Sequence, residues 1–372
     1  MEQIHFNYKD IIRVYRYGFS GRRIGIHFTG IILAYLIYQI IVYLSLIIVD
    51  GSKAQDVWTS HGLLPMLPFV DNDLDVVSSI VMWFGIVIFG IVFLLCSTLS
   101  SKITFEQLRG ESLYTIGNAL GVLRRRWKTV IGSFLWLFLL ILCLLLIPIC
   151  VGLLAKIPFL KGTILTISSI FTPIGFLFGI LLLFIFLVCL AGLFLIPAMA
   201  ATTEVDAFEI IYQLFSIMWN QPWRLMSYGL LLSALKLFHV PIWALFCIGG
   251  FLIALLPTYY LHPSFLQDAL LYVNKWLGGI IQKISGIFLS DDGALFNTEL
   301  PDMSFSTTIC AIFLAFMLIS LFGGILGYLF SLVSVGTTLI YVILRKYVDG
   351  ENIIQPIAAL EQQPILTGDE GY

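Results

Sequence analysis

Charge is scarce in this sequence of 372 residues. Only 11% of the residues are Asp, Glu, Lys or Arg, whereas soluble globular chains carry about 25%. At the same time, 59% of the residues are hydrophobic. A chain with so few charges cannot cover an apolar core with a polar surface, so the composition excludes a soluble fold.

Acidic residues are missing from every long apolar run, and several catalytic motifs are missing as well. None of the 22 acidic residues lies in a predicted span, which argues against proton- or sodium-coupled transport through a carboxylate relay. The motifs H-E-x-x-H, G-x-x-x-x-G-K-[ST] and G-x-S-x-G do not occur. Only His27 and His239 lie near spans, which disfavours a haem held by two histidines. We therefore expect no enzyme activity, no cofactor and no metal site.

What is abundant is uncharged apolar sequence. Each run exceeds the roughly 20 residues that a helix needs to cross about 30 Å of hydrocarbon. The runs do not alternate in polarity, which excludes membrane β-strands. Five runs are free of charge and the sixth carries only Lys236 and His239; they are Ile24–Val49, Val76–Ser101, Thr129–Ala155, Gly162–Thr203, Met303–Leu344 and, for the sixth, Leu225–Leu256.

The positive charges indicate how these spans are oriented. With six spans and a cytoplasmic N-terminus, 14 of the 20 Lys and Arg residues fall inside and five outside, and Lys236 lies within a span. We predict an all-α integral membrane protein of the bacterial inner membrane, with six transmembrane helices and both termini cytoplasmic. Residues 1–346 form one membrane domain and residues 347–372 a cytoplasmic tail. Gly323-Gly324 marks a break, a close helix contact or a re-entrant turn in the last span.

A theme recurs before the first, third and fifth spans: an amphipathic stretch that ends in basic and aromatic residues. It predicts a three-unit internal repeat over residues 1–101, 102–203 and 204–346, and the alternative is that these stretches are ordinary connectors. In the third stretch, apolar residues recur at helical spacing, which favours cytoplasmic interfacial helices; these residues are Phe208, Ile211, Leu214, Phe215 and Met218. In the outer segment from Pro257 to Asp302, the section Leu266–Ile287 is predicted to be a lid or docking helix.

Two groups of residues are candidates for function. The first is an intramembrane polar site around the only charged residue inside a span, where Pro241 frees a backbone carbonyl; it comprises Ser233, Lys236, His239 and Pro241. The alternative is a lysine satisfied by water or carbonyls. The second group combines cations with interfacial aromatics and suits anionic lipid head groups; it comprises Arg124, Arg125, Arg126, Trp127, Lys128, Trp223 and Arg224.

Four segments carry a resemblance to a known family. They are Pro197–Ala201, Asp206–Ile210, Gln221–Leu225 and Ile340–Gly350. The chain resembles poorly characterised bacterial multi-pass proteins related to the membrane domain of glycerophosphoryl diester phosphodiesterases. The resemblance implies a shared membrane fold without an agreed activity. The catalytic domain is not present in this sequence, so the enzymatic activity is not implied.

We expect a non-catalytic subunit or scaffold of a membrane assembly. Its expected partners are anionic lipids, other membrane subunits or further copies of the chain, and not nucleic acid. The main alternative is a transporter or channel for a lipid or small anionic solute, with Lys236 as its binding cation, and an intramembrane enzyme of unknown type is the third.

Overall fold

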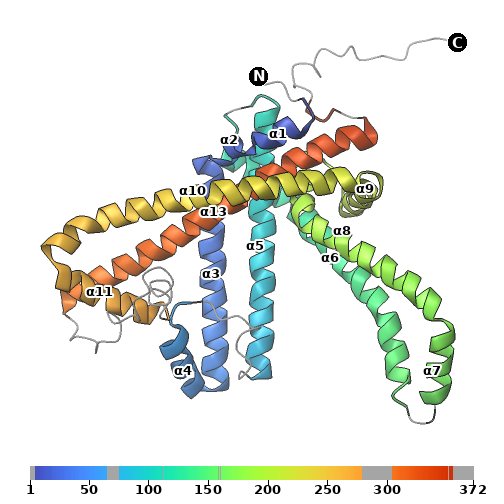
Figure 1. Ribbon diagram of the computed structural model, residues 1–372, viewed down its shortest axis with the longest axis horizontal. Coiled ribbons are helices and arrows are strands. Elements are labelled where there is room, and N and C mark those ends of the chain that lie inside the picture. The colour runs from blue at the N-terminus through green and yellow to red at the C-terminus, as the bar shows by residue number, and fades with distance from the viewer. Residues whose placement is uncertain are drawn as a thin grey trace. The chain divides into compact units, whose positions relative to one another are not determined.

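The computed structural model describes residues 5–64, 75–111, 113–157, 159, 161–278, 304–350 and 352–354. Every regular element within these ranges is an α-helix (Figure 1). Six helices are long and apolar enough to cross a membrane, which confirms the predicted multi-pass helical fold. These are α3 (Gly21–Val49), α5 (Val76–Leu108), α6 (Ile116–Leu154), α8 (Thr172–Thr202), α10 (Pro222–Leu261) and α13 (Phe305–Asp349).

Shorter helices precede or follow these spans. They are α1 (Tyr8–Ile12), α2 (Val14–Gly18), α4 (Gly51–His61), α7 (Lys161–Ile170), α9 (Ala207–Asn220) and α11 (Pro263–Trp276). Side-chain caps fix where several helices begin, because they bind backbone N–H groups that lack an intrahelical partner. Asp50 accepts from the Ser52 N–H at the start of α4, Thr115 from Asn118 at the start of α6, and Asp206 from Glu209 at the start of α9.

The helices form two compact units that interleave along the sequence. Unit 1 contains Met1–Ser20, Leu94–Leu235 and Ser331–Tyr372, and unit 2 contains Gly21–Phe93 and Lys236–Phe330. Three long helices, α5, α10 and α13, pass from one unit into the other. The three-unit repeat of the sequence stays a prediction, since its boundaries are not those of the compact units.

In unit 1, α6 and α8 lie side by side and α9 packs against both (Figure 1). One face of α9 is buried through Ile210, Leu214 and Ile217. Gly192 of α8 permits this contact, because a Cβ atom there would lie 3.0 Å from Leu214 and 3.2 Å from Leu137. The third predicted interfacial stretch is therefore a separate helix. The first forms the short helices α1 and α2, and the second is shared between the end of α5 and the start of α6.

In unit 2, α3 packs closely against α13. A Cβ atom on Gly323 would lie 3.0 Å from the Phe28 ring, and one on Gly327 would lie 3.1 Å from the Ile24 carbonyl oxygen. The helix α13 continues without interruption through Gly323-Gly324, so the pair does not break the span, and Gly323 makes a close helix contact. The run Gly162–Thr203, in contrast, is interrupted at Phe171, where α7 ends and α8 begins.

Candidate functional site: a cationic pocket in unit 1

The predicted polar site on α10 remains a single stretch of helix. Ser233 and Pro241 are exposed, whereas Lys236 and His239 are half-buried. Within the described ranges, no carboxylate lies near enough to Lys236 for an ion pair. The helix passes from unit 1 to unit 2 between Leu235 and Lys236.

The predicted lipid-contact cluster on α6 is divided among different faces of the helix. Arg125 and Arg126 line a pocket, whereas Arg124 and Lys128 are exposed away from it. Successive residues of an α-helix point about 100° apart, so five consecutive residues cannot face one site. The Lys128 ammonium lies 5.8 Å from the centroid of the Trp127 ring. On α10, Trp223 is exposed and the Arg224 guanidinium lies 3.8 Å from the Tyr347 ring centroid.

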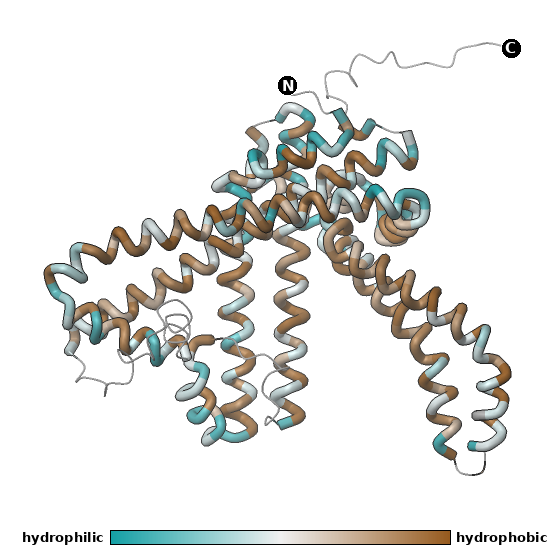
Figure 2. Tube along the Cα trace, in the orientation of Figure 1, coloured by the Kyte–Doolittle hydropathy of each residue, from teal (hydrophilic) through white to brown (hydrophobic). Residues whose placement is uncertain are grey.

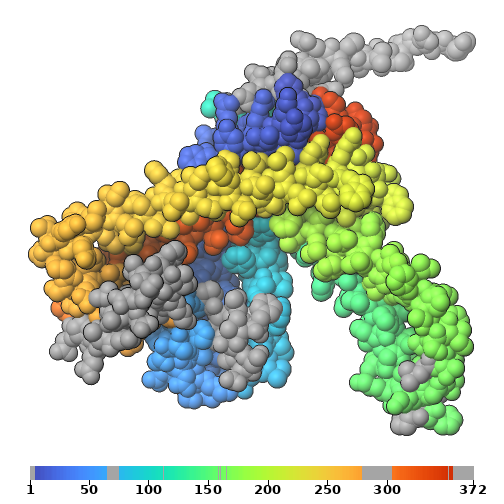
Figure 3. All heavy atoms as spheres, in the orientation of Figure 1, coloured from blue at the N-terminus to red at the C-terminus, as the bar shows by residue number. Residues whose placement is uncertain are grey.

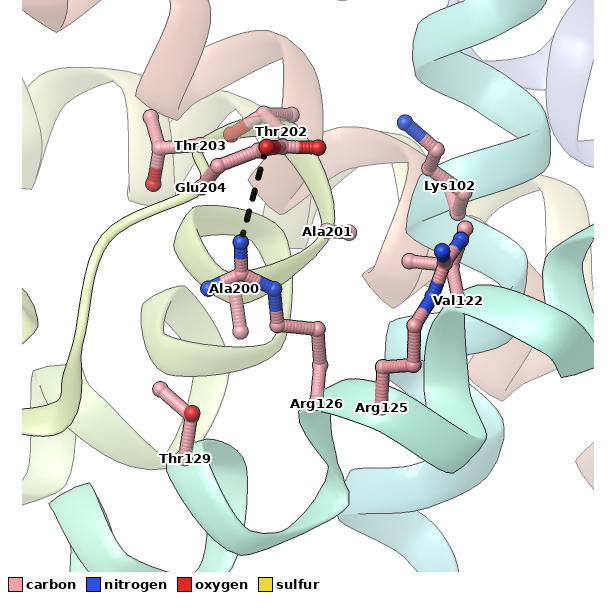
Figure 4. A pocket seen from close by; sticks show the side chains of 10 residues that line it. All are labelled: Lys102, Val122, Arg125, Arg126, Thr129, Ala200, Ala201, Thr202, Thr203 and Glu204. Carbon is pink, nitrogen blue, oxygen red and sulfur yellow. Dashed lines mark ion pairs between the residues drawn. The ribbon is translucent and has the colours of Figure 1, made fainter.

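The pocket lies where α5, α6 and α8 meet in unit 1 and has a volume of about 350 Å³ (Figure 4). Small-molecule sites typically occupy about 300–1,000 Å³. Its lining contains three cations but a single carboxylate. The lining residues are Lys102 from α5, Val122, Arg125, Arg126 and Thr129 from α6, and Ala200, Ala201, Thr202, Thr203 and Glu204 at the end of α8.

One backbone hydrogen bond and one ion pair involve Arg126. Its Nη1 donates to the Val205 carbonyl oxygen at 2.9 Å, and its Nη2 lies 3.9 Å from a Glu204 carboxylate oxygen. The Glu204 side chain is 98% exposed, so water screens this ion pair and it contributes little to stability. Figure 4 shows Arg126 directed toward Glu204, while Arg125 and Lys102 lie on the other side of the pocket. Among the described residues, Arg125 has no hydrogen bond or ion pair, which leaves its guanidinium available to a ligand.

Lys102 forms an ion pair with Glu106, which also contacts Arg109. Its ammonium lies 2.5 Å from one Glu106 oxygen, and Arg109 lies 3.5 Å from the other. The Phe105 ring lies between the two cations, 5.6 Å from each. Glu106 therefore balances one of its two basic neighbours.

The pKa of Tyr114, in the connection from α5 to α6, is affected by the same charged residues. Burial and then the carboxylates of Glu106 and Glu111 raise the pKa of its phenol, while Arg125 opposes them. The phenol therefore remains neutral at physiological pH and adds no negative charge beside Arg125.

The arrangement suits an anion with several oxygen atoms. Arginine presents a planar fork of N–H donors that matches phosphate and carboxylate, and lysine adds a compact charge. The Thr202 and Thr203 hydroxyls donate to the Ala198 and Met199 carbonyl oxygens, at 2.8 and 2.7 Å. With their protons engaged, these hydroxyls can only accept further hydrogen bonds, so the donors that the pocket offers to an anion come from its cations.

Sequence reasoning identified only two of the ten lining residues as contacts. It counted Lys102 only as a marker of orientation, and it did not select Thr202 and Thr203 although they directly follow the apolar segment Pro197–Ala201. Within the described ranges, no group of three or more His, Cys, Asp or Glu side chains is placed to hold a metal ion. No protein-family model, curated protein or solved structure matches this chain.

Proposed function

We propose that the protein is a non-catalytic subunit or scaffold of a membrane assembly that binds phosphate-bearing lipid head groups in the cationic pocket. The observation that carries this proposal is the convergence of Lys102, Arg125 and Arg126 in a pocket of about 350 Å³ against one exposed carboxylate. The proposal places the pocket on the cytoplasmic side of a bacterial inner membrane, because the excess of Lys and Arg in the connecting segments obeys the positive-inside rule.

The position of the pocket along the spans supports a lipid ligand. Thr129 and Ala200 lie at the ends of the uncharged parts of α6 and α8, where a bilayer passes from hydrocarbon to head groups. Exposed aromatic residues nearby in the sequence, Trp127 and Trp219 among them, are typical of this interface. A lipid phosphate in the pocket would therefore keep its acyl chains at the level of the spans.

The adjacent residues Arg124 and Arg125 offer a matched test. Both substitutions, Arg125→Gln and Arg124→Gln, remove one charge from neighbouring positions on α6, but only Arg125 lines the pocket. A diffuse surface attraction of about 1 kcal/mol per charge would lower affinity about fivefold in both variants. Loss of a charged hydrogen bond, worth about 1.5–3 kcal/mol, would lower it roughly 10- to 100-fold in Arg125→Gln alone.

The measurement is binding of phosphatidylglycerol to the detergent-purified protein by native mass spectrometry, with phosphatidylcholine as the neutral comparison. Equal losses in the two variants would contradict a built pocket. Arg126 is left unchanged because its bond to the Val205 carbonyl oxygen makes it part of the local structure.

The assembly part of the proposal rests on α10. No residue of the most hydropathic window of this helix is buried inside the chain, so its surface is available to lipid or to another subunit. Mild solubilisation followed by native mass measurement should yield an oligomer or a heteromeric complex. A clean monomer would contradict the subunit assignment while leaving head-group binding open to the test above.

A second candidate, transport of a lipid or small anionic solute, is favoured by the half-buried Lys236. A cation within a span is costly unless it is paired or hydrated, and such residues usually mark a pathway. In proteoliposomes, Lys236→Met should abolish flux of phosphate or a fluorescent anionic lipid without lowering expression. Unchanged flux would remove Lys236 from the mechanism.

A further inference from the structure

In unit 2, the chain turns back along α3 immediately after this span ends. The helix α4 packs against it through Ala54 and Val57, which join a cluster with Val42 and Leu46, and Figure 3 shows the atoms of α4 directly against those of α3. The residues after α4 then reach further along α3. Leu63 presents its carbonyl oxygen to the Gln39 side-chain amide at 2.5 Å, and Gln39 is ten residues, or about 15 Å, from the end of α3.

Three polar side chains of α3 bind this returning segment. The Tyr35 hydroxyl donates to the same Leu63 carbonyl oxygen, and the Tyr43 hydroxyl donates to the carbonyl oxygen of Gly62. Irregular backbone at such a position needs partners for its polar groups, because hydrocarbon provides none. These side chains supply the partners, so specific hydrogen bonds hold the returning segment against α3.

The helix α11 turns back in the same way after α10. Its buried residues form one cluster with Ala311 and Leu314 of α13, and Phe251 and Leu255 of α10 pack against this cluster. Phe251 is ten residues from the end of α10, again about 15 Å along the helix. Both short helices thus return along the spans that precede them.

The ends of α4 and α11 are joined by backbone contacts. The Leu63 N–H donates to the Trp276 carbonyl oxygen at 2.6 Å. Gly62 and Gly278 both have positive φ, 57° and 55°. A Cβ atom on Gly62 would overlap the Trp276 carbonyl oxygen, and one on Gly278 would lie 2.8 Å from the His61 carbonyl oxygen. Only glycine allows both the conformation and this approach of the two chains.

This junction lies at membrane depth. The uncharged part of α3 from Ile24 to Val49 spans about 39 Å at 1.5 Å per residue, which exceeds the roughly 30 Å of hydrocarbon. Even with the bilayer boundary placed at Ile24, hydrocarbon would extend to Tyr43 and would include Gln39. On the same turns, Ile40 is 65% exposed and Leu44 is 54% exposed, as expected of side chains that contact lipid.

The face of α3 opposite its lipid-exposed side chains is covered by the polar helix α4. α4 contains mostly hydrophilic residues, whereas α3 beside it is hydrophobic (Figure 2). Its polar side chains away from α3 are exposed, namely Ser52, Gln55, Asp56, Thr59 and Ser60. The Ser52, Thr59 and Ser60 hydroxyls donate to oxygen atoms of the same segment, but hydrocarbon cannot hydrate the Asp56 carboxylate or the Gln55 side-chain amide, since each polar group without a partner costs several kcal/mol. Water must reach this face.

We propose that the exposed face of α4 borders an aqueous vestibule, which enters unit 2 from the membrane side opposite Arg22 and Arg23 and whose floor is the junction of α4 with α11. The vestibule admits water and small hydrophilic solutes to about the level of Gln39. This inference is independent of the pocket in unit 1, and it gives the hydrophilic solute of a transport function a route of entry.

Thiol accessibility tests the proposal in the full-length protein. The six native cysteines are replaced by serine or alanine, and single substitutions are introduced at three positions in unit 2. Ser60→Cys lies deep on α4, Ser52→Cys marks the beginning of α4 near the membrane surface, and Ile40→Cys lies on the lipid side of α3 at the depth of the junction. A membrane-impermeant methanethiosulfonate reagent is added to proteoliposomes on one side at a time.

The expected result is that Ser60→Cys reacts within about tenfold of the rate of Ser52→Cys and from the same side. Ile40→Cys should react at least about 100-fold more slowly, because a thiolate hardly forms in hydrocarbon. A rate for Ser60→Cys as low as that of Ile40→Cys would overturn the proposal, and so would reaction from the opposite side only. Thr59→Cys is an independent second position, and labelling after denaturation together with a monodisperse elution profile verifies that each variant is present and folded.

Discussion

Replacing Gln213 by leucine removes the acceptor of a buried hydrogen bond that joins two helices of unit 1. The Tyr341 hydroxyl on α13 donates to the Gln213 side-chain oxygen on α9 at 2.9 Å. Both residues are almost completely buried, and the Gln213 amide nitrogen in turn donates to Glu209 at 3.0 Å. The bond connects positions 128 residues apart in the sequence, so it stabilises tertiary structure rather than a single helix.

The expected loss of free energy of unfolding depends on which polar groups each substitution leaves without a partner. Gln213→Leu leaves a buried phenol without its acceptor, which costs about 1–3 kcal/mol. Thr202 and Thr203 lie close to the same phenol and offer a substitute acceptor, so we expect the lower half of that range. Tyr341→Phe removes the donor with little change in shape and should cost about 0.5–1.5 kcal/mol. Hydrogen bonds between membrane helices show coupling energies that average about 0.6 kcal/mol.

The assay is a double-mutant cycle measured by SDS-induced unfolding in mixed micelles. The double variant should be more stable than the sum of the two single effects predicts, with a coupling energy of about 0.5–1.5 kcal/mol. Strict additivity, within about 0.3 kcal/mol, would refute the assigned bond. A full loss of fold in Gln213→Leu but not in Tyr341→Phe would show instead that packing of α9, and not the hydrogen bond, dominates.

Two further predictions concern topology and packing. In intact cells, Leu113→Cys in the connection between α5 and α6 should resist an impermeant thiol reagent, while Phe159→Cys at the opposite end of the α6 and α8 pair should be labelled. Both side chains are highly exposed. The reverse labelling pattern would invert the proposed orientation. In α13, Gly327→Ala should destabilise the protein by about 1–3 kcal/mol because the added Cβ atom meets α3 backbone atoms at 3.1 and 3.2 Å. Gly324→Ala, which meets open space, should instead stabilise the helix by about 0.5–1 kcal/mol; equal effects of the two substitutions, measured as SDS midpoints, would argue against the α3–α13 contact.

The six spans were predictable from the sequence because the cost of burying charge in hydrocarbon acts on each helix separately. The uncharged runs therefore coincide with the apolar parts of α3, α5, α6, α8, α10 and α13. The ends of these helices were less predictable. α6 starts at Ile116, well before the apolar run at Thr129, because a Thr115 cap and good helix formers such as Leu and Arg extend it.

The pocket was predictable only in part, because its residues come from three helices. Arg125 and Arg126 were selected since basic residues beside a span suit lipid phosphates. The same reasoning selected Arg124 and Lys128, which face away from the pocket. Lys102 and Arg125 come together only where α5 and α6 meet at the pocket, and a sequence without known contacts between helices does not contain that information.

The returning helices α4 and α11 were less predictable still, because their low hydropathy is typical of loops between spans. α4 is as polar as an ordinary connector, and what places it along α3 is a set of hydrogen bonds from Tyr35, Gln39 and Tyr43 to Gly62 and Leu63. The predicted outer helix over Leu266–Ile287 was closer to the structure. α11 covers Pro263–Trp276 and packs against α10 and α13, while residues 279–287 lie outside the described ranges.

The proposed repeat and the two sites are related through the short helix that follows the first span of each predicted unit. This helix is α4 in the first unit, α7 in the second and α11 in the third. In the first and third units it is followed within two residues by a glycine of positive φ, and these two glycines form the junction in unit 2. In the second unit, Phe171 with a φ of −88° connects α7 directly to α8. The pocket lies at the other ends of α6 and α8, so substitutions at Arg125 should leave the thiol accessibility of α4 unchanged.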